Sequence, residues 1–133
     1  MIAVVTDSCA SIPPNLVESL QIEMVPYYLH IGHETSRDLI DVSHDEFFEW
    51  LSTADTLPTT ANPGPGDYLD AFKRAAERAD GIVSIHMTSR GSGAFQAACI
   101  GQEMARAQLP GIRIEVIDTL QVSMVHGWAA IEA

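Results

Sequence analysis

Short polar segments rich in hydroxyl groups follow apolar runs at several places in this sequence. The apolar runs span residues 2–5, 82–85 and 114–117. The polar residues that follow them include Thr6, Asp7, Ser8, Ser89, Ser92, Gly93 and Asp118. Hydroxyl groups and glycine amides can donate hydrogen bonds to a carboxylate or a phosphate, and aspartate can bind a metal ion or a ligand hydroxyl.

Ser92 and Gly93 are expected at the start of a helix. Exposed amides at a helix N-terminus carry partial positive charge and bind carboxylate or phosphate groups. Ser92 could instead only cap the helix, as serine commonly does. Gly91 and Gly93 favour the binding role, because glycine lets a ligand approach the backbone closely.

A further polar segment spans residues 57–66, where prolines and glycines surround Thr60, Ala61 and Asn62. Proline restricts the backbone, so the Thr60 hydroxyl could be held in place for a ligand. The segment could equally be a plain connection to the next helix. Asp7 and Asp118 have a simple structural role as well, since aspartate at a strand end commonly accepts hydrogen bonds from the amides of its own turn.

The histidines and cysteines show none of the spacings of metal-binding or catalytic motifs. Cys9 follows Asp7 and Ser8, but no base near it in the sequence supports a nucleophilic role. His86 precedes a polar segment and is the one histidine that a phosphotransferase could use as a nucleophile. No nucleotide-binding or hydrolase motif is present. We therefore expect no metal site, no cofactor and a binding protein rather than an enzyme.

The order of the predicted elements indicates the fold class. Strands are expected at residues 2–5, 22–29, 82–87 and 112–118, with Pro26 as a weak point in the second. Helices are expected after Ser11, after the capping-box pair Ser43 and Glu46, and at residues 67–79, 92–107 and 122–133. This alternation predicts an α/β fold, a three-layer sandwich with a mainly parallel sheet and helices on both faces. The polar segments should then converge at one edge of the sheet.

Size and charge restrict the function further. The 133 residues suit one domain, and the formal net charge of −11 argues against binding to nucleic acid or to a membrane surface. No apolar stretch is long enough to span a bilayer. The N-terminus lacks the features of a signal peptide, so a cytoplasmic location is expected.

Several motifs, in the same order and spacing, resemble the DegV family over essentially the whole chain. Residues 5–8 resemble the opening V-T-D-S of the family, and residues 38–48 its segment D-x-x-D-(I/V)-S-x-x-E-(F/Y). Residues 57–68 are similar to P-x-T-S-Q-P-S-P-G-(D/E)-(F/Y), residues 88–98 to S-S-x-L-S-G-T-Y-Q-S-A, and residues 117–127 to V-I-D-S-x-x-x-S-x-G-x-G. Ala61, Asn62, Gly91 and Ala94 depart from these patterns, whereas Thr60 and Ser92 match them.

The resemblance implies a bacterial protein that binds a long-chain fatty acid. Thr60, Ser92 and the amide of Gly93 would then hold the carboxylate. A secondary group of site residues would be Thr6, Asp7, Ser8, Ala61, Asn62, Ser89 and Asp118. Some members present the fatty acid to a separate kinase, which makes an acyl-phosphate, so the implied partners are the lipid and a kinase subunit.

Family members have two domains, and residues 1–133 resemble the N-terminal α/β domain alone. The second, C-terminal lipid-binding domain is expected to be absent, which would leave apolar surface open for self-association. Two alternatives remain open at this point. One is a phosphotransferase-type enzyme related to dihydroxyacetone kinase, and the other is a ligand-free structural or regulatory fragment that acts by self-association.

Overall fold

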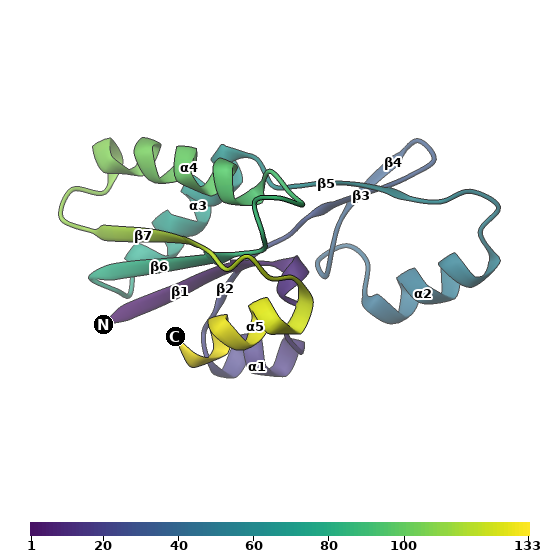
Figure 1. Ribbon diagram of the computed structural model, residues 1–133, viewed down its shortest axis with the longest axis horizontal. Coiled ribbons are helices and arrows are strands. Elements are labelled where there is room, and N and C mark those ends of the chain that lie inside the picture. Colours follow the sequence, from purple (N-terminus) through teal and green to yellow (C-terminus); the bar gives the residue numbers. More distant parts are fainter.

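Four parallel strands form the central sheet of the computed structural model, which describes residues 1–133 (Figure 1). In spatial order they are β2 (Glu23–Val25), β1 (Ile2–Asp7), β6 (Gly81–His86) and β7 (Arg113–Asp118). The apolar strands β1 and β6 lie in the middle and pair in parallel, with Ile2 opposite Gly81 and Thr6 opposite Ile85. Strands of this composition suit the interior of a parallel sheet, where both faces are covered.

Helices cover both faces of this sheet, which confirms the predicted three-layer α/β sandwich. α3 (Pro65–Ala76) and α4 (Ala94–Gln108) lie on one face, and α1 (Pro14–Ser19) and α5 (Ser123–Glu132) lie on the other (Figure 1). A short 3-10 turn, η1 (Ser8–Ala10), follows β1. None of these helices has the length and apolar character needed to cross a lipid bilayer.

The main core lies between the sheet and the pair α3 and α4. Tyr68 and Phe72 of α3 are completely buried there, as their spacing predicts. Gly101 lets α4 approach α3 closely, because a Cβ at this position would lie 2.9 Å from Cβ of Tyr68. Buried alanines along α4 allow the same close packing.

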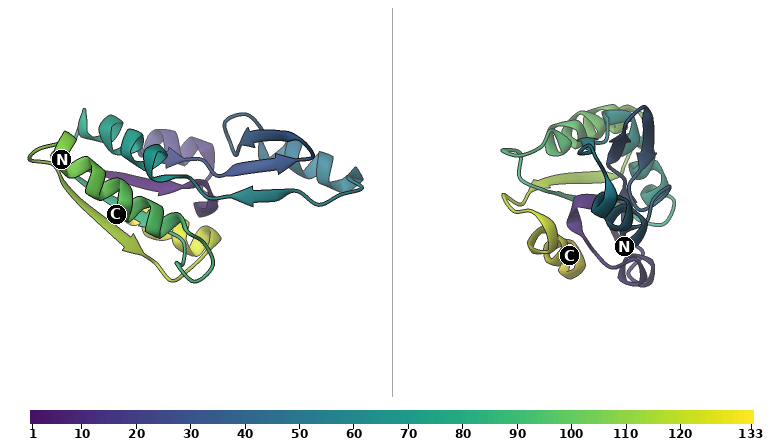
Figure 2. Two further views of the ribbon diagram at one scale, coloured as in Figure 1. Left: turned by 90° about the horizontal axis from the view of Figure 1, so that it is seen from above. Right: turned by 90° about the vertical axis from the view of Figure 1, so that its right-hand side faces the viewer.

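A second, antiparallel sheet projects from one end of the central sheet as an arm (Figures 1 and 2). Its strands lie in the order β4 (Glu34–Arg37), β3 (Tyr28–Ile31) and β5 (Thr59–Ala61), and α2 (His44–Thr53) belongs to the same arm. We refer to residues 28–61 as the arm and to the remainder as the body.

The arm corrects two predictions about strands. The strand expected at residues 22–29 is two strands in two sheets, because Pro26 and Tyr27 carry the chain from β2 in the body to β3 in the arm. Residues 57–66, expected to be a loop, include β5, which pairs with β3 through Leu29 opposite Thr60. This pairing depends on a distant segment, so local sequence could not indicate it.

The helix boundaries also differ from those predicted. α3 begins at Pro65 rather than residue 67, since proline is favoured in the first turn and the Asp67 carboxylate accepts a hydrogen bond of 2.7 Å from the Gly64 amide. α3 ends at Ala76 rather than residue 79, and α4 begins at Ala94 rather than Ser92. α5 spans Ser123–Glu132, one residue shorter at each end than predicted. The capping box of Ser43 and Glu46 at the start of α2 is confirmed.

Candidate functional site

A pocket of about 400 Å³ lies at the junction of the body and the arm. This volume is within the usual range of small-molecule sites. Three residues that the sequence singled out, Thr60, Ser92 and Gly93, all contribute to its wall. The complete lining is Cys9, Tyr27, Leu29, Asp38, Thr60, Ala61, Asn62, Met87, Gly91, Ser92 and Gly93. The fold therefore brings the segment after β6 against a strand of the arm.

The arm side of the pocket is formed by β5 and the residue that follows it. Thr60 is exposed at the pocket, and its strand is held in register by β3. Asn62 donates a hydrogen bond of 2.8 Å to the Pro63 carbonyl. A Cβ at Gly93 would lie only 3.0 Å from Asn62 Oδ1, so glycine at this position permits the close approach of the start of α4 to the residue that follows β5.

The body side of the pocket is formed by the start of α4. The Ser92 hydroxyl oxygen accepts a hydrogen bond of 3.1 Å from the Ala94 amide and lies 2.6 Å from the Tyr27 hydroxyl. Ser92 thus precedes the N-cap Gly93, accepts from the first amide of α4 and also lines the pocket. The positive end of the α4 dipole lies at this wall of the pocket.

The charges at the pocket limit its chemistry. Its lining contains no lysine, arginine or histidine, and Asp38 is its one carboxylate. Burial and the neighbouring Asp7 raise the pKa of the Cys9 thiol to about 12, so the thiol stays neutral and is a poor nucleophile. The pocket offers hydroxyl and amide donors to a ligand.

Thr6, Asp7 and Ser8 are not part of the pocket lining. All three are buried. Asp7 Oδ1 accepts a hydrogen bond of 3.1 Å from the Cys9 amide, which confirms that this aspartate orders its own turn. The Ser8 hydroxyl accepts a hydrogen bond of 3.1 Å from the Tyr27 amide and so fixes the start of the arm to the end of β1.

Ser89 and Asp118 lie outside the lining and bind each other. The Ser89 amide donates to both carboxylate oxygens of Asp118 at 3.3 Å, and the Leu120 amide donates to Oδ1 at 2.9 Å. The Ser89 side chain is the main cause that lowers the pKa of the Asp118 carboxyl, and the amides of Leu120 and Ser89 lower it further. The pocket is thus built from the ends of β1 and β6 and from the arm, whereas the end of β7 lies beside it.

Three buried side chains form a chain of hydrogen bonds in the order Asp7, His86 and Ser84. Asp7 Oδ2 lies 2.9 Å from His86 Nδ1, and the Ser84 hydroxyl lies 2.6 Å from His86 Nε2. The same order of groups occurs in catalytic triads. All three side chains have no exposed surface, so no substrate can reach them. The phosphotransferase alternative needed an accessible His86, and the structure contradicts that requirement.

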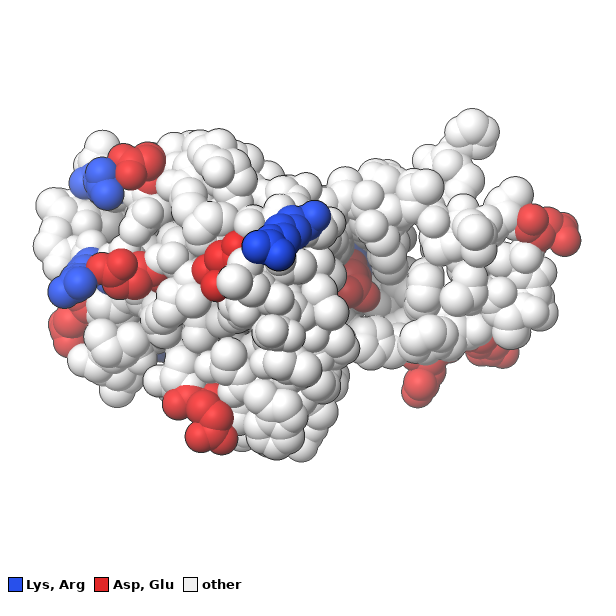
Figure 3. Space-filling model, in the orientation of Figure 1, with Lys and Arg blue, Asp and Glu red and all other residues white.

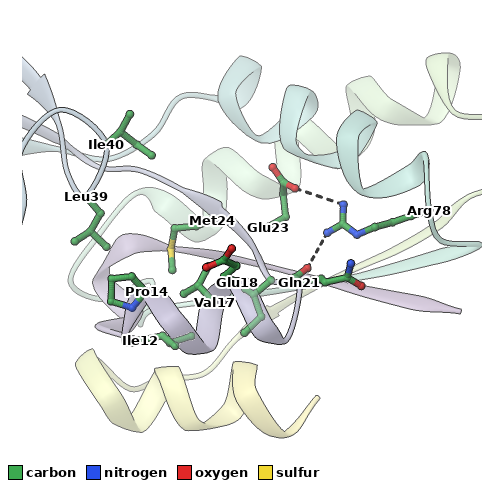
Figure 4. A pocket seen from close by; sticks show the side chains of 11 residues that line it. Ile12, Pro14, Val17, Glu18, Gln21, Glu23, Met24, Leu39, Ile40 and Arg78 are labelled. Atoms are coloured by element: carbon green, nitrogen blue, oxygen red, sulfur yellow. Dashed lines mark hydrogen bonds and ion pairs between the residues drawn. The ribbon is translucent and has the colours of Figure 1, made fainter.

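A second cavity, of about 410 Å³, lies between α1, β2 and residues 39–40 (Figure 4). Its walls are largely apolar and include Val17 and Met24. The polar groups at its end bind each other, since Arg78 donates to the Gln21 carbonyl at 2.8 Å and lies 3.6 Å from the Glu23 carboxylate. None of the predicted site residues lines this cavity.

Several lining residues escaped the sequence analysis, among them Tyr27, Met87 and Asp38. Tyr27 had one usable signal, because it follows Pro26 at the weak point of a predicted strand. A residue next to a break in a strand is not bound to the alternation of the sheet, so its side chain can face a binding site. Asp38 is the first residue of the motif at residues 38–48, whereas Met87 carries no comparable signal.

Comparison with known proteins places these features in a family. The model of the DegV family, described as uncharacterised proteins, matches residues 1–133. Protein DegV of Bacillus subtilis is 32% identical over 132 residues, which are 99% of this chain and 46% of that protein. A DegV domain-containing protein of Caldanaerobacter subterraneus is 31% identical over 132 residues, covering 99% of this chain and 45% of that protein.

Solved structures show the same relationship. The crystal structure of Bacillus subtilis DegV, described as a fatty acid binding protein, superposes with a TM-score of 0.86 at 32% identity, over 98% of this chain and 45% of that one. A Thermus thermophilus DegV family protein, described for its fatty acid binding, gives a TM-score of 0.84 at 30% identity, over 98% and 45% of the two chains. The chain spans less than half the length of these relatives, and it belongs to the DegV family.

Proposed function

We propose that this chain binds a long-chain fatty acid in the pocket between body and arm. The observation that carries this proposal is that Thr60, Ser92 and Gly93 line one pocket although they come from distant segments. Hydroxyl and amide donors stabilise an ionised carboxylate by charge-assisted hydrogen bonds. The positive end of α4 adds to this stabilisation. The acyl chain would lie over the apolar groups of Leu29 and Met87, while Ala61 and Asn62 would complete the headgroup site.

We further propose that the chain presents this carboxylate to a separate fatty acid kinase, which forms the acyl-phosphate. Thr60 and Gly93 are both exposed, so a second protein could reach a headgroup held between them. Incubation with ATP and a purified bacterial fatty acid kinase, followed by trapping with hydroxylamine, should yield the acyl hydroxamate. Absence of the hydroxamate from lipid-loaded protein would contradict this step alone.

We propose, in addition, that residues 1–133 form the N-terminal domain of the two-domain arrangement of this family. A lipid-binding domain outside these residues would supply the rest of the acyl tunnel. In its absence the exposed apolar side chains of α5, Val125 and Trp128, favour self-association. The two free cysteines, Cys9 and Cys99, suit the reducing cytoplasm as the site of this function.

The first test is native mass spectrometry of the purified protein, before and after addition of palmitate, with identification of the extracted lipid. We expect one fatty acid per chain, and we expect Thr60→Ala and Ser92→Ala to lose it. Thr59→Ala is the matched control, because Thr59 is the neighbouring residue on β5 and does not line the pocket. The same spectra report the oligomeric state.

A protein that remains empty when palmitate is offered would contradict fatty acid binding by residues 1–133. Equal loss of lipid in Thr59→Ala and Thr60→Ala would contradict the assignment of the headgroup site.

A further inference from the structure

The Ser92 hydroxyl has two neighbours that decide where its hydrogen atom points. A serine oxygen accepts two hydrogen bonds and donates one. The Ala94 amide already fills one acceptor position, at 3.1 Å. The Tyr27 hydroxyl lies 2.6 Å away and can either donate to Ser92 or accept from it.

Tyr27 is held rigidly enough to act as a fixed neighbour. Its side chain is buried in the main core, with 7% of its surface exposed. Its amide donates to the Ser8 hydroxyl at 3.1 Å, and its carbonyl accepts from the Asp38 amide at 2.9 Å. Burial raises the pKa of the Tyr27 phenol, so it keeps its hydrogen atom throughout the physiological pH range.

The Tyr27 hydroxyl has three hydrogen-bonding neighbours, namely the Ser92 oxygen, the Met87 sulfur at 3.2 Å and the Cys9 thiol. The hydroxyl oxygen is the strongest acceptor of the three, since thioether and thiol sulfur accept only weakly. When Tyr27 donates to Ser92, both acceptor positions of the Ser92 oxygen are filled. The Ser92 hydrogen atom then points away from both partners and is available to a ligand in the pocket that Ser92 lines.

We propose that Tyr27 is a positioning residue that makes Ser92 a hydrogen-bond donor only, and thereby selects headgroups that accept hydrogen bonds. This inference rests on the proposed fatty acid site and adds a specificity determinant to it. A carboxylate, which only accepts, gains a hydrogen bond strengthened by the preceding donation from Tyr27. A fatty alcohol, whose hydroxyl also needs an acceptor, finds none at Ser92.

The test compares two ligands of equal chain length, palmitate and hexadecanol, in the wild-type protein and in Tyr27→Phe. We expect the preference for palmitate over hexadecanol to fall about tenfold, the value of one hydrogen bond. Most of the change should be weaker palmitate binding. Tyr28→Phe is the matched control, because it removes a phenol hydroxyl from the next residue, which donates to Asp67 at 2.9 Å and does not line the pocket. An unchanged preference in Tyr27→Phe would overturn the proposal.

A second measurement decides the direction of the hydrogen bond in the ligand-free protein. The Tyr27 hydroxyl proton is identified by nuclear magnetic resonance through its loss in Tyr27→Phe. We expect its chemical shift to change strongly in Ser92→Ala and little in Met87→Leu. The reverse order would place this proton on the sulfur and overturn the proposal, whether or not lipid binds. Failure of the wild-type protein to bind either lipid would instead contradict the proposed function.

Discussion

The Tyr68 hydroxyl is buried in the core without a hydrogen-bond partner. Leaving such a group unsatisfied costs about 1–3 kcal/mol. Tyr68→Phe removes the hydroxyl and keeps the ring that packs against His86, with ring centroids 5.0 Å apart. We expect the free energy of unfolding to rise by about 1 kcal/mol in urea denaturation. Tyr28→Phe should lower it, because that hydroxyl has a partner. A lower free energy of unfolding in Tyr68→Phe would contradict the conclusion that the Tyr68 hydroxyl lacks a hydrogen-bond partner.

His126 carries the other buried atom without a partner, Nδ1. Its Nε2 lies 3.0 Å from the Ile85 carbonyl and 2.9 Å from the Thr6 hydroxyl. Burial is the main cause that lowers the pKa of His126; nearby His86 lowers it further, while Asp7 and the Ile85 carbonyl oppose the shift. Protonation of His126 is therefore less favourable in the folded protein than in the unfolded chain, which takes up this proton as the pH falls below about 6.5. This contribution to stability is complete above that pH and is lost below it.

We expect His126→Leu to weaken this pH dependence. Thr6 still donates to the Ile85 carbonyl at 2.8 Å, so the substitution leaves no new unpaired group. Thermal unfolding between pH 7 and pH 5 should show a smaller loss of stability than in the wild-type protein. His33→Leu, in the exposed turn of the arm, is the control and should keep the wild-type slope. An equal loss of stability between pH 7 and pH 5 in the wild-type protein and both variants would contradict the assignment of this pH dependence to His126.

Asp38 is the one acidic group in the pocket lining, and it opposes a ligand carboxylate. For the proposed fatty acid complex, we expect Asp38→Asn to tighten palmitate binding about threefold at low ionic strength, with a smaller effect at high salt. Isothermal titration at two salt concentrations measures both effects. Asp45→Asn, on the exposed face of α2, controls for the change in net charge. Equal tightening in both variants would assign the effect to net charge rather than to the pocket.

The helix α2 depends strongly on its own sequence. None of its residues is fully buried, so its stability comes largely from local bonds. The Ser43 hydroxyl accepts from the Glu46 amide at 3.3 Å, and the Glu46 carboxylate accepts from the Ser43 amide at 2.8 Å. Ser43→Ala should destabilise α2 by about 1 kcal/mol and speed its amide hydrogen exchange about fivefold.

The cooperative unfolding of the body should not change in Ser43→Ala, because the main core contains no residue of α2. Ser52→Ala is the control within the same helix, since its hydroxyl bonds the Glu49 carbonyl and caps nothing. Exchange that stays slow in Ser43→Ala would show that contacts within the arm, rather than the capping box, hold α2.

The elements also show which parts of the fold the sequence could predict. The central strands and α2 to α5 follow from local signals such as apolar runs, capping residues and the buried spacing of Tyr68 and Phe72. The arm does not, because β5 exists only through its pairing with β3. For the candidate site, the sequence could indicate the two segments that carry Thr60 and Ser92. The hydrogen bond between the Tyr27 and Ser92 hydroxyls could not be predicted, since it joins groups 65 residues apart in the sequence.

At the scale of the molecule, charge and shape divide the chain into two unlike parts. Figure 3 shows acidic side chains toward the end of the arm, whereas the clearly visible Lys and Arg side chains on this face lie over the body. Arg37 is the only Lys or Arg in residues 28–61. It forms an ion pair with Asp41 at 2.9 Å, which lowers the pKa of that carboxyl to about 2. The remaining acidic residues of the arm therefore give it a negative charge that no Lys or Arg within the arm offsets.

The pocket lies where the arm meets the body, and both parts contribute residues to its lining. Cys9 and Ser92 belong to the body, whereas Leu29 and Thr60 belong to the arm. A ligand that bridges Thr60 and Ser92, as proposed for the fatty acid, would tie the arm to the body. Linkage makes such coupling reciprocal, so any partner that binds this tied arrangement more tightly would raise the affinity for the ligand by the same factor.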